Sequence, residues 1–128
     1  MTAMRLAYAN VFVRNFDAAI VFYRDQLQLP LNMVEPNFGF ASFALGEHSL
    51  GVAELKGDTG NEMRSGAAAG RHTGIGLAVT DLDSAYAEFV SRGVAFTMPP
   101  TKQPWGGYMA LLSDPEGNIF YLDQVAAS

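Results

Sequence analysis

Several features are missing from this chain of 128 residues, and each absence excludes a class of function. The chain has no cysteine, which excludes disulfides, thiolate metal sites and cysteine nucleophiles. No apolar run approaches the length of a bilayer span, and the first residues lack the charged start and continuous apolar segment of a secretory signal. A cytoplasmic protein without a membrane partner is therefore expected.

Charged residues are also sparse, at 16% of the chain, whereas hydrophobic residues reach 49%. This composition is typical of a folded domain. Eight Lys and Arg against thirteen Asp and Glu give a net charge of -5. The negative balance disfavours nucleic acid and anionic membranes as partners. It favours cationic small molecules mildly, although a surface charge that maintains solubility is the better explanation.

The most informative feature present is an internal repeat. Residues 13–19 (VRNFDAA) and 79–85 (VTDLDSA) are similar, lie 66 residues apart, and each connects an alternating apolar stretch to an amphipathic one. Half of the chain is too small to bury an adequate core alone. The two halves are therefore expected to pack together, or to pack across a dimer.

Each half of the chain predicts the same order of elements. Residues 6–13 read as a strand, after which Asn15 can cap a helix. In the second half an alternating strand ends at Val79, Asp81 caps a helix that runs through Arg92, and Gly93 ends it in the left-handed conformation. Three short strands are expected after each helix, at residues 31–34, 38–45 and 50–55 and at residues 95–98, 108–113 and 119–124.

These elements predict an α+β fold of two tandem βαβββ modules in a single domain. Module 1 covers about residues 1–55 and module 2 about residues 72–128. The connector at 56–71 contains four glycines and is a candidate lid over a cavity. Residues 114–118 (DPEGN) are expected to form a hairpin turn, because Pro fixes φ and Gly supplies a positive φ.

The chain resembles the vicinal oxygen chelate superfamily, which includes glyoxalase I, extradiol dioxygenases and fosfomycin- and bleomycin-resistance proteins. The resemblance covers nearly the whole chain. It rests on the paired βαβββ modules, on residues 22–24 (FYR), on residues 103–106 (QPWG) and on the turn at 114–118. It implies a curved mixed sheet around a cavity, the glyoxalase/bleomycin-resistance fold.

Metal-dependent members of that superfamily hold a divalent ion with one side chain from the first strand and one from the last strand of each module. The resemblance assigns these four positions to Tyr8, Glu54, Gly74 and Tyr121. Only Glu54 is a good ligand for a hard metal ion, because glycine has no side chain and a neutral phenol binds metals poorly. His72, which lies on the same strand face as Gly74, could substitute, and His48 is a second candidate, although both are also typical surface or turn histidines.

Strand alternation predicts which side chains line the cavity. Tyr8 and Asn10 are expected on the concave face of the sheet, opposite the face that packs against the helices. Gly74 and Gly76 are expected on the same face in the second module, where they leave room for a bulky ligand. Aromatic residues near the strands could form the walls. The predicted ligand-binding residues are Tyr8, Asn10, Phe40, Glu54, Gly74, Trp105, Tyr108 and Tyr121.

Glu54 leaves three alternatives open. A buried carboxylate without a metal ion should pair with a cation, which a ligand could supply, or should act as a proton carrier. It could also simply accept a hydrogen bond from Tyr8 or Tyr121. Glu54 is therefore the candidate catalytic residue if the protein is an enzyme.

The resemblance and the missing ligands together predict a metal-free homodimer without a cofactor. It would sequester a small organic molecule, cationic or aromatic, as bleomycin-resistance proteins do. One alternative is a glyoxalase-like or dioxygenase-like enzyme with a displaced Zn, Ni, Fe or Mn site at Glu54 and His72. A third possibility is an interaction module that binds no small molecule.

Overall fold

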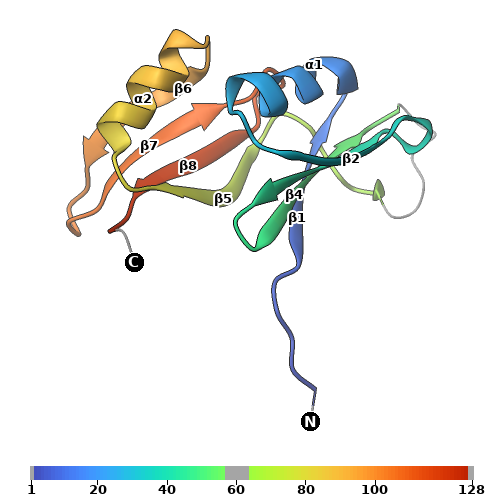
Figure 1. Ribbon diagram of the computed structural model, residues 1–128, viewed down its shortest axis with the longest axis horizontal. Coiled ribbons are helices and arrows are strands. Elements are labelled where there is room, and N and C mark those ends of the chain that lie inside the picture. The colour runs from blue at the N-terminus through green and yellow to red at the C-terminus, as the bar shows by residue number, and fades with distance from the viewer. Residues whose placement is uncertain (1, 57–63, 127–128) are drawn as a thin grey trace. The chain divides into compact units, whose positions relative to one another are not determined.

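Each half of the chain forms a four-stranded mixed sheet with a helix packed on one face, in a computed structural model that describes residues 2–56 and 64–126 (Figure 1). The chain divides into unit 1, Met1–Ala69, and unit 2, Gly70–Ser128. This boundary falls inside the predicted connector. Residues 57–63 of that connector, and with them the predicted lid, lie outside the described residues.

Unit 1 has the predicted βαβββ order, with two short additional helical turns. In its sheet β1 runs parallel to β4, the other neighbours are antiparallel, and the strand order is β1-β4-β3-β2. Its elements are β1 (Tyr8–Val13), α1 (Phe16–Val21), the π-helical turn η1 (Phe22–Gln26), β2 (Leu31–Glu35), the 3₁₀ turn η2 (Pro36–Phe38), β3 (Phe40–Leu45) and β4 (His48–Glu54).

Unit 2 repeats this topology, with β5 parallel to β8 and the strand order β5-β8-β7-β6. Its elements are β5 (His72–Val79), α2 (Leu82–Ser91), β6 (Ala95–Lys102), β7 (Tyr108–Ser113) and β8 (Ile119–Gln124). The two orders are identical once each strand is matched to its counterpart. The sequence repeat therefore corresponds to a repeat of structure, and the predicted α+β architecture is confirmed.

Both predicted helix caps are present. The Asn15 side chain accepts a hydrogen bond from the Ala18 backbone N–H at 3.0 Å, and the Asp81 side chain accepts one from the Ser84 N–H at 3.1 Å. These bonds satisfy backbone donors that have no partner within the first turn. At the other end of α2, Gly93 has φ 86°, the left-handed conformation that was expected.

The core of each unit lies between its sheet and its helix. In unit 1, Val11 and Val13 of β1 are buried with Tyr23, whose ring packs 4.9 Å from Phe22 and 5.8 Å from Phe43, centroid to centroid. In unit 2 the buried hydrophobic residues are Leu82, Val94, Ala110, Leu112, Phe120 and Leu122. The alternation predicted for β1 is confirmed. The sheet face turned away from the helix is called the open face below.

The turn at residues 114–118 is built around two buried polar side chains. Asp114 Oδ1 accepts hydrogen bonds from the backbone N–H groups of Glu116 and Asn118, and Asp114 Oδ2 accepts one from Asn118 Nδ2 at 2.9 Å. Asn118 Oδ1 in turn accepts from the Gly70 N–H at 2.9 Å. The predicted hairpin turn is confirmed, and it also holds the segment that enters β5.

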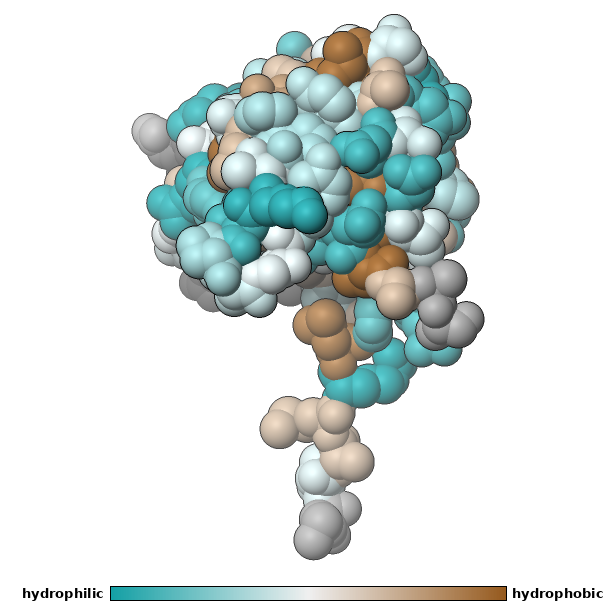
Figure 2. Space-filling model, turned by 90° about the vertical axis from the view of Figure 1, so that its left-hand side faces the viewer, coloured by the Kyte–Doolittle hydropathy of each residue, from teal (hydrophilic) through white to brown (hydrophobic). Residues whose placement is uncertain are grey.

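Hydrophilic residues cover most of the surface drawn in Figure 2, where hydrophobic residues occur in small separate groups. Every helix within residues 2–56 and 64–126 is too short or too polar to cross a bilayer. Residues before β1 form an extended segment that carries exposed Met4 and Leu6 (Figure 1).

Candidate ligand-binding site

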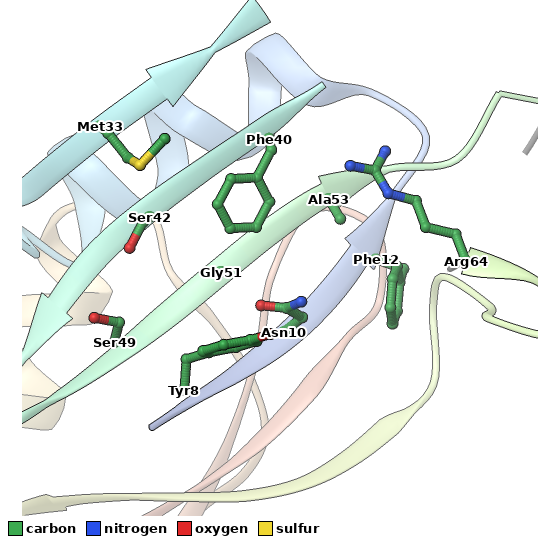
Figure 3. A pocket seen from close by; sticks show the side chains of 10 residues that line it. All are labelled: Tyr8, Asn10, Phe12, Met33, Phe40, Ser42, Ser49, Gly51, Ala53 and Arg64. Atoms are coloured by element: carbon green, nitrogen blue, oxygen red, sulfur yellow. The ribbon is translucent and has the colours of Figure 1, made fainter. Parts of the chain in front are cut away.

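The open face of unit 1 contains a cavity of about 440 Å³ (Figure 3). This volume falls within the range of small-molecule sites. Strands β1, β3 and β4 supply most of the lining, together with one residue from β2 and one from the segment that begins at residue 64. The lining residues are Tyr8, Asn10, Phe12, Met33, Phe40, Ser42, Ser49, Gly51, Ala53 and Arg64.

Three predicted binding residues are thus brought together. Tyr8, Asn10 and Phe40 all line this cavity, with Tyr8 at an exposed edge, 59% accessible to solvent. Asn10 Oδ1 is buried and has no hydrogen-bond partner among the described residues. A buried acceptor without a partner is costly, so it indicates a place for a donor on a bound molecule.

Gly51 makes the position of Asn10 possible. A Cβ atom added to Gly51 would lie 2.9 Å from both Asn10 Cγ and Phe40 Cε1, and it would overlap Asn10 Oδ1. The missing side chain therefore lets the Asn10 amide and the Phe40 ring lie against the floor of the cavity. The sequence analysis assigned no role to Gly51.

Arg64 is a lining residue that the sequence analysis did not select. Its guanidinium donates to the backbone carbonyl of Glu54 at 2.6 Å through Nη1 and to that of Phe38 at 2.9 Å through Nη2. Figure 3 shows the guanidinium extending toward the cavity beside Ala53 and Phe40. One positive group is therefore fixed at a cavity whose walls are mainly apolar.

Glu54 does not lie on the open face, so its predicted orientation was wrong. In the parallel pairing of β1 and β4, Ala53 lies opposite Phe12, whereas Glu54 lies opposite the buried Val13. The Glu54 carboxylate instead borders a hollow beside α1, with its Oε1 atom 3.6 Å from Lys56 Nζ. The expected pairing of Glu54 with a cation is thus met by a lysine of the same unit.

The strand register also corrects the match between the last strands of the two modules. Asn10 pairs with Gly51 in unit 1, and its repeat counterpart Gly76 pairs with Tyr121 in unit 2. Gly51, rather than Glu54, is therefore the counterpart of Tyr121. The error arose because residues 114–118 connect β7 to β8, whereas only residues 46–47 connect β3 to β4.

In unit 2, Tyr121 and His72 lie on the open face, as predicted. Their rings are 4.7 Å apart, and His72 Nδ1 accepts a hydrogen bond from the Gly74 N–H at 3.0 Å. Gly74 has φ 73° and interrupts the register of β5, so any other residue there would be strained. A Cβ at Gly74 would have no neighbour within 4 Å, in agreement with the predicted free space.

Asp123 is a residue of unit 2 that the sequence analysis missed. It pairs with Ala78 and shares the open face with Tyr121, and its Oδ1 atom is buried with no hydrogen-bond partner among the described residues. The strand alternation that selected Tyr121 would also have selected Asp123.

Tyr108 and Trp105 do not form cavity walls within unit 2. Tyr108 shares its strand face with the buried Ala110 and Leu112, and its hydroxyl donates to Asp83 Oδ1 of α2 at 2.6 Å. Trp105 lies in the turn between β6 and β7 and is 72% exposed. Both residues were selected as aromatic side chains near strands, without regard to strand alternation, which places Met109, Leu111 and Ser113 of β7 on the opposite face from Tyr108.

The hydrogen bond to Asp83 raises the pKa of Tyr108 above its ordinary value of 10.0, and partial burial and the negative charge of Asp83 act in the same direction. The contact therefore stabilises the fold below about pH 10, and this contribution is lost as the pH rises through the folded-state pKa. In an absorbance titration of the five tyrosines, Tyr108→Phe should remove the component that ionises at raised pH. Asp83→Asn should move that component to lower pH, and an unchanged titration in both variants would contradict the assignment.

The residues at the four metal-ligand positions do not fit a divalent ion. With the corrected register these positions hold Tyr8, Gly51, Gly74 and Tyr121, which offer two phenols and no carboxylate or imidazole. Within the described parts of the chain, no three His, Asp or Glu side chains come close enough to hold an ion. The weak candidates Glu54 and His72 have other contacts, with Lys56 and with the Gly74 N–H.

Comparison with known proteins gives one family and several relatives. The family model "Glyoxalase/Bleomycin resistance protein/Dioxygenase superfamily" matches residues 5–122. The protein YraH of Bacillus subtilis (strain 168) is 26% identical over 123 residues, which cover 91% of this chain and 94% of YraH.

Solved structures also share the fold. A member of the same superfamily from Sphaerobacter thermophilus is 31% identical to this chain, with a TM-score of 0.75. The match covers 96% of this chain and 98% of the Sphaerobacter chain. TnmS3, an antibiotic binding protein from Streptomyces sp. CB03234, is 26% identical with a TM-score of 0.77, and the match covers 98% of this chain and 99% of TnmS3.

Proposed function

Since the chain belongs to the Glyoxalase/Bleomycin resistance protein/Dioxygenase superfamily, we propose that it is a binding member of that superfamily. It sequesters a small organic molecule in the cavity on the open face of unit 1, and it does so without a metal ion. The observation that carries this proposal is the 440 Å³ cavity itself, which is lined by aromatic residues and by Asn10, whose Oδ1 has no hydrogen-bond partner in the described parts of the chain.

Two further observations support binding over metal-dependent catalysis. The four positions at which metal-dependent relatives carry ligands hold no carboxylate or imidazole in this chain. In addition, the similar structure of TnmS3 is that of an antibiotic binding protein. The residues present therefore suit the retention of an organic molecule better than the coordination of an ion.

We also propose a homodimer, in which a second copy contributes to the surroundings of the ligand. Strand β1 is an edge strand of its sheet, and its first residue, Tyr8, is 59% exposed. Leu6, two residues before the strand, is 63% exposed. Exposed strand edges that carry apolar residues are typical sites of pairing between chains.

A thermal-shift screen with polycyclic aromatic antibiotics tests the proposed binding. A compound present at about 100 times its Kd would stabilise the protein by about 2.7 kcal/mol, which raises the Tm by several degrees. The matched control is Asn10→Ala, which removes the unpartnered acceptor and should reduce the shift for the same compound. If no compound in the screen raised the Tm, the interaction module without a small-molecule ligand would replace this proposal.

A further inference from the structure

We propose that the cavity of unit 1 selects planar aromatic compounds carrying an anionic oxygen group, which Arg64 binds. This inference rests on the proposed function and specifies the chemistry of its ligand. The ligand inferred here is anionic, whereas the acidic composition of the chain favours a cationic one.

The first argument is the way Arg64 is held. Two of its five N–H donors are used by the carbonyls of Glu54 and Phe38, at 2.6 and 2.9 Å, so the guanidinium is oriented before any ligand arrives. Carbonyl oxygens fix its position but do not neutralise its charge. Within residues 2–56 and 64–126, no carboxylate lies at ion-pair distance from Arg64.

The second argument is the environment of that charge. Phe12, Met33 and Phe40 supply apolar surface around the cavity, which lowers the local dielectric and strengthens the attraction for an anion. A guanidinium also matches a carboxylate geometrically and stacks on aromatic rings. The overall charge of -5 has little effect here, because exposed charges are screened beyond about 8 Å at physiological ionic strength.

The third argument is the second polar group of the cavity. Asn10 Oδ1 lies against Gly51 and has no hydrogen-bond partner among the residues that the structure describes, so it can accept a hydrogen bond from the ligand. A ligand that satisfies both groups carries an acceptor or anion for Arg64, a flat ring for the aromatic walls and an N–H or O–H donor for Asn10. Hydroxylated aromatic acids have all three features.

Three probes with one ring system separate the charge preference from binding itself. These are 2-naphthoate, which is anionic, 2-naphthamide, which is neutral, and 2-naphthylmethylamine, which is cationic. Their dissociation constants are measured by calorimetry on the full chain and on two variants. One variant is Arg64→Gln, and its control is Arg24→Gln, which removes the same charge from an exposed arginine that is paired with Asp25 outside the cavity.

We expect 2-naphthoate to bind about tenfold more tightly than the amide, because a charge-assisted hydrogen bond contributes a free energy of that size. The amine should bind more weakly than the amide. The Arg64→Gln variant should lose this preference and still bind the amide, whereas Arg24→Gln should retain it. Equal binding of all three probes, or tightest binding of the amine, would overturn the role of Arg64 and leave the binding cavity in place. If none of the probes bound, the proposed function would be contradicted as well.

Discussion

Gly51→Ala is expected to lower the free energy of unfolding by about 1–3 kcal/mol, the usual cost of overpacking, and to weaken the binding of 2-naphthoate about tenfold or more. The reason is steric. The new Cβ would lie 2.9 Å from Asn10 Cγ and from Phe40 Cε1, so the amide and the ring would both have to move from the cavity floor. Chemical denaturation measures the first effect, and calorimetry measures the second.

Gly76→Ala is the matched control, because Gly76 is also a strand glycine on an open face. A Cβ at Gly76 would have Asp123 Oδ2 at 3.9 Å as its nearest neighbour, an ordinary contact. This variant should be as stable as the original chain, or more stable by about 0.5–1 kcal/mol, because glycine is unfavourable within strands. Equal destabilisation by the two substitutions would show that the packing around Gly51 is not the cause.

Asn118→Ala is expected to lower the free energy of unfolding by about 3 kcal/mol, since it leaves several buried polar groups without partners. The Asn118 side chain is buried, donates to Asp114 Oδ2 at 2.9 Å and accepts from the Gly70 N–H at 2.9 Å. Its loss removes both the internal bond of the turn and the bond that holds the start of β5. Urea denaturation followed by circular dichroism measures the change.

Asn32→Ala provides the comparison for Asn118→Ala. Asn32 is exposed, and its Nδ2 donates a long hydrogen bond of 3.4 Å to Ser42 Oγ. A change within about 0.5 kcal/mol is expected there. If Asn118→Ala were equally mild, the turn would not depend on its buried network.

Most of the fold could be predicted because local signals and the repeat agree. Asn15 and Asp81 cap their helices through hydrogen bonds that depend on neighbouring backbone alone. Strand alternation correctly separated Val11 and Val13 from Tyr8 and Asn10. Such features require no knowledge of which strands pair, so a single sequence contains the information they need.

The site was harder to predict because it depends on strand register and on tertiary contacts. Glu54 was matched to Tyr121 along the sequence, but the two connecting turns differ in length and the pairing places Gly51 opposite Asn10. Arg64 lies within the glycine-containing connector, which has no periodic pattern, and only the fold brings its guanidinium to the carbonyls of Glu54 and Phe38.

The most direct test of the central claim is a calorimetric titration of 2-naphthoate into protein treated with EDTA, repeated after addition of Zn²⁺ or Mn²⁺. The claim is that the cavity on the open face of unit 1 binds an aromatic anion through Arg64 and its aromatic walls, with no metal ion. The predicted result is one dissociation constant under all three conditions. Binding that disappears with EDTA and returns with either ion would contradict it.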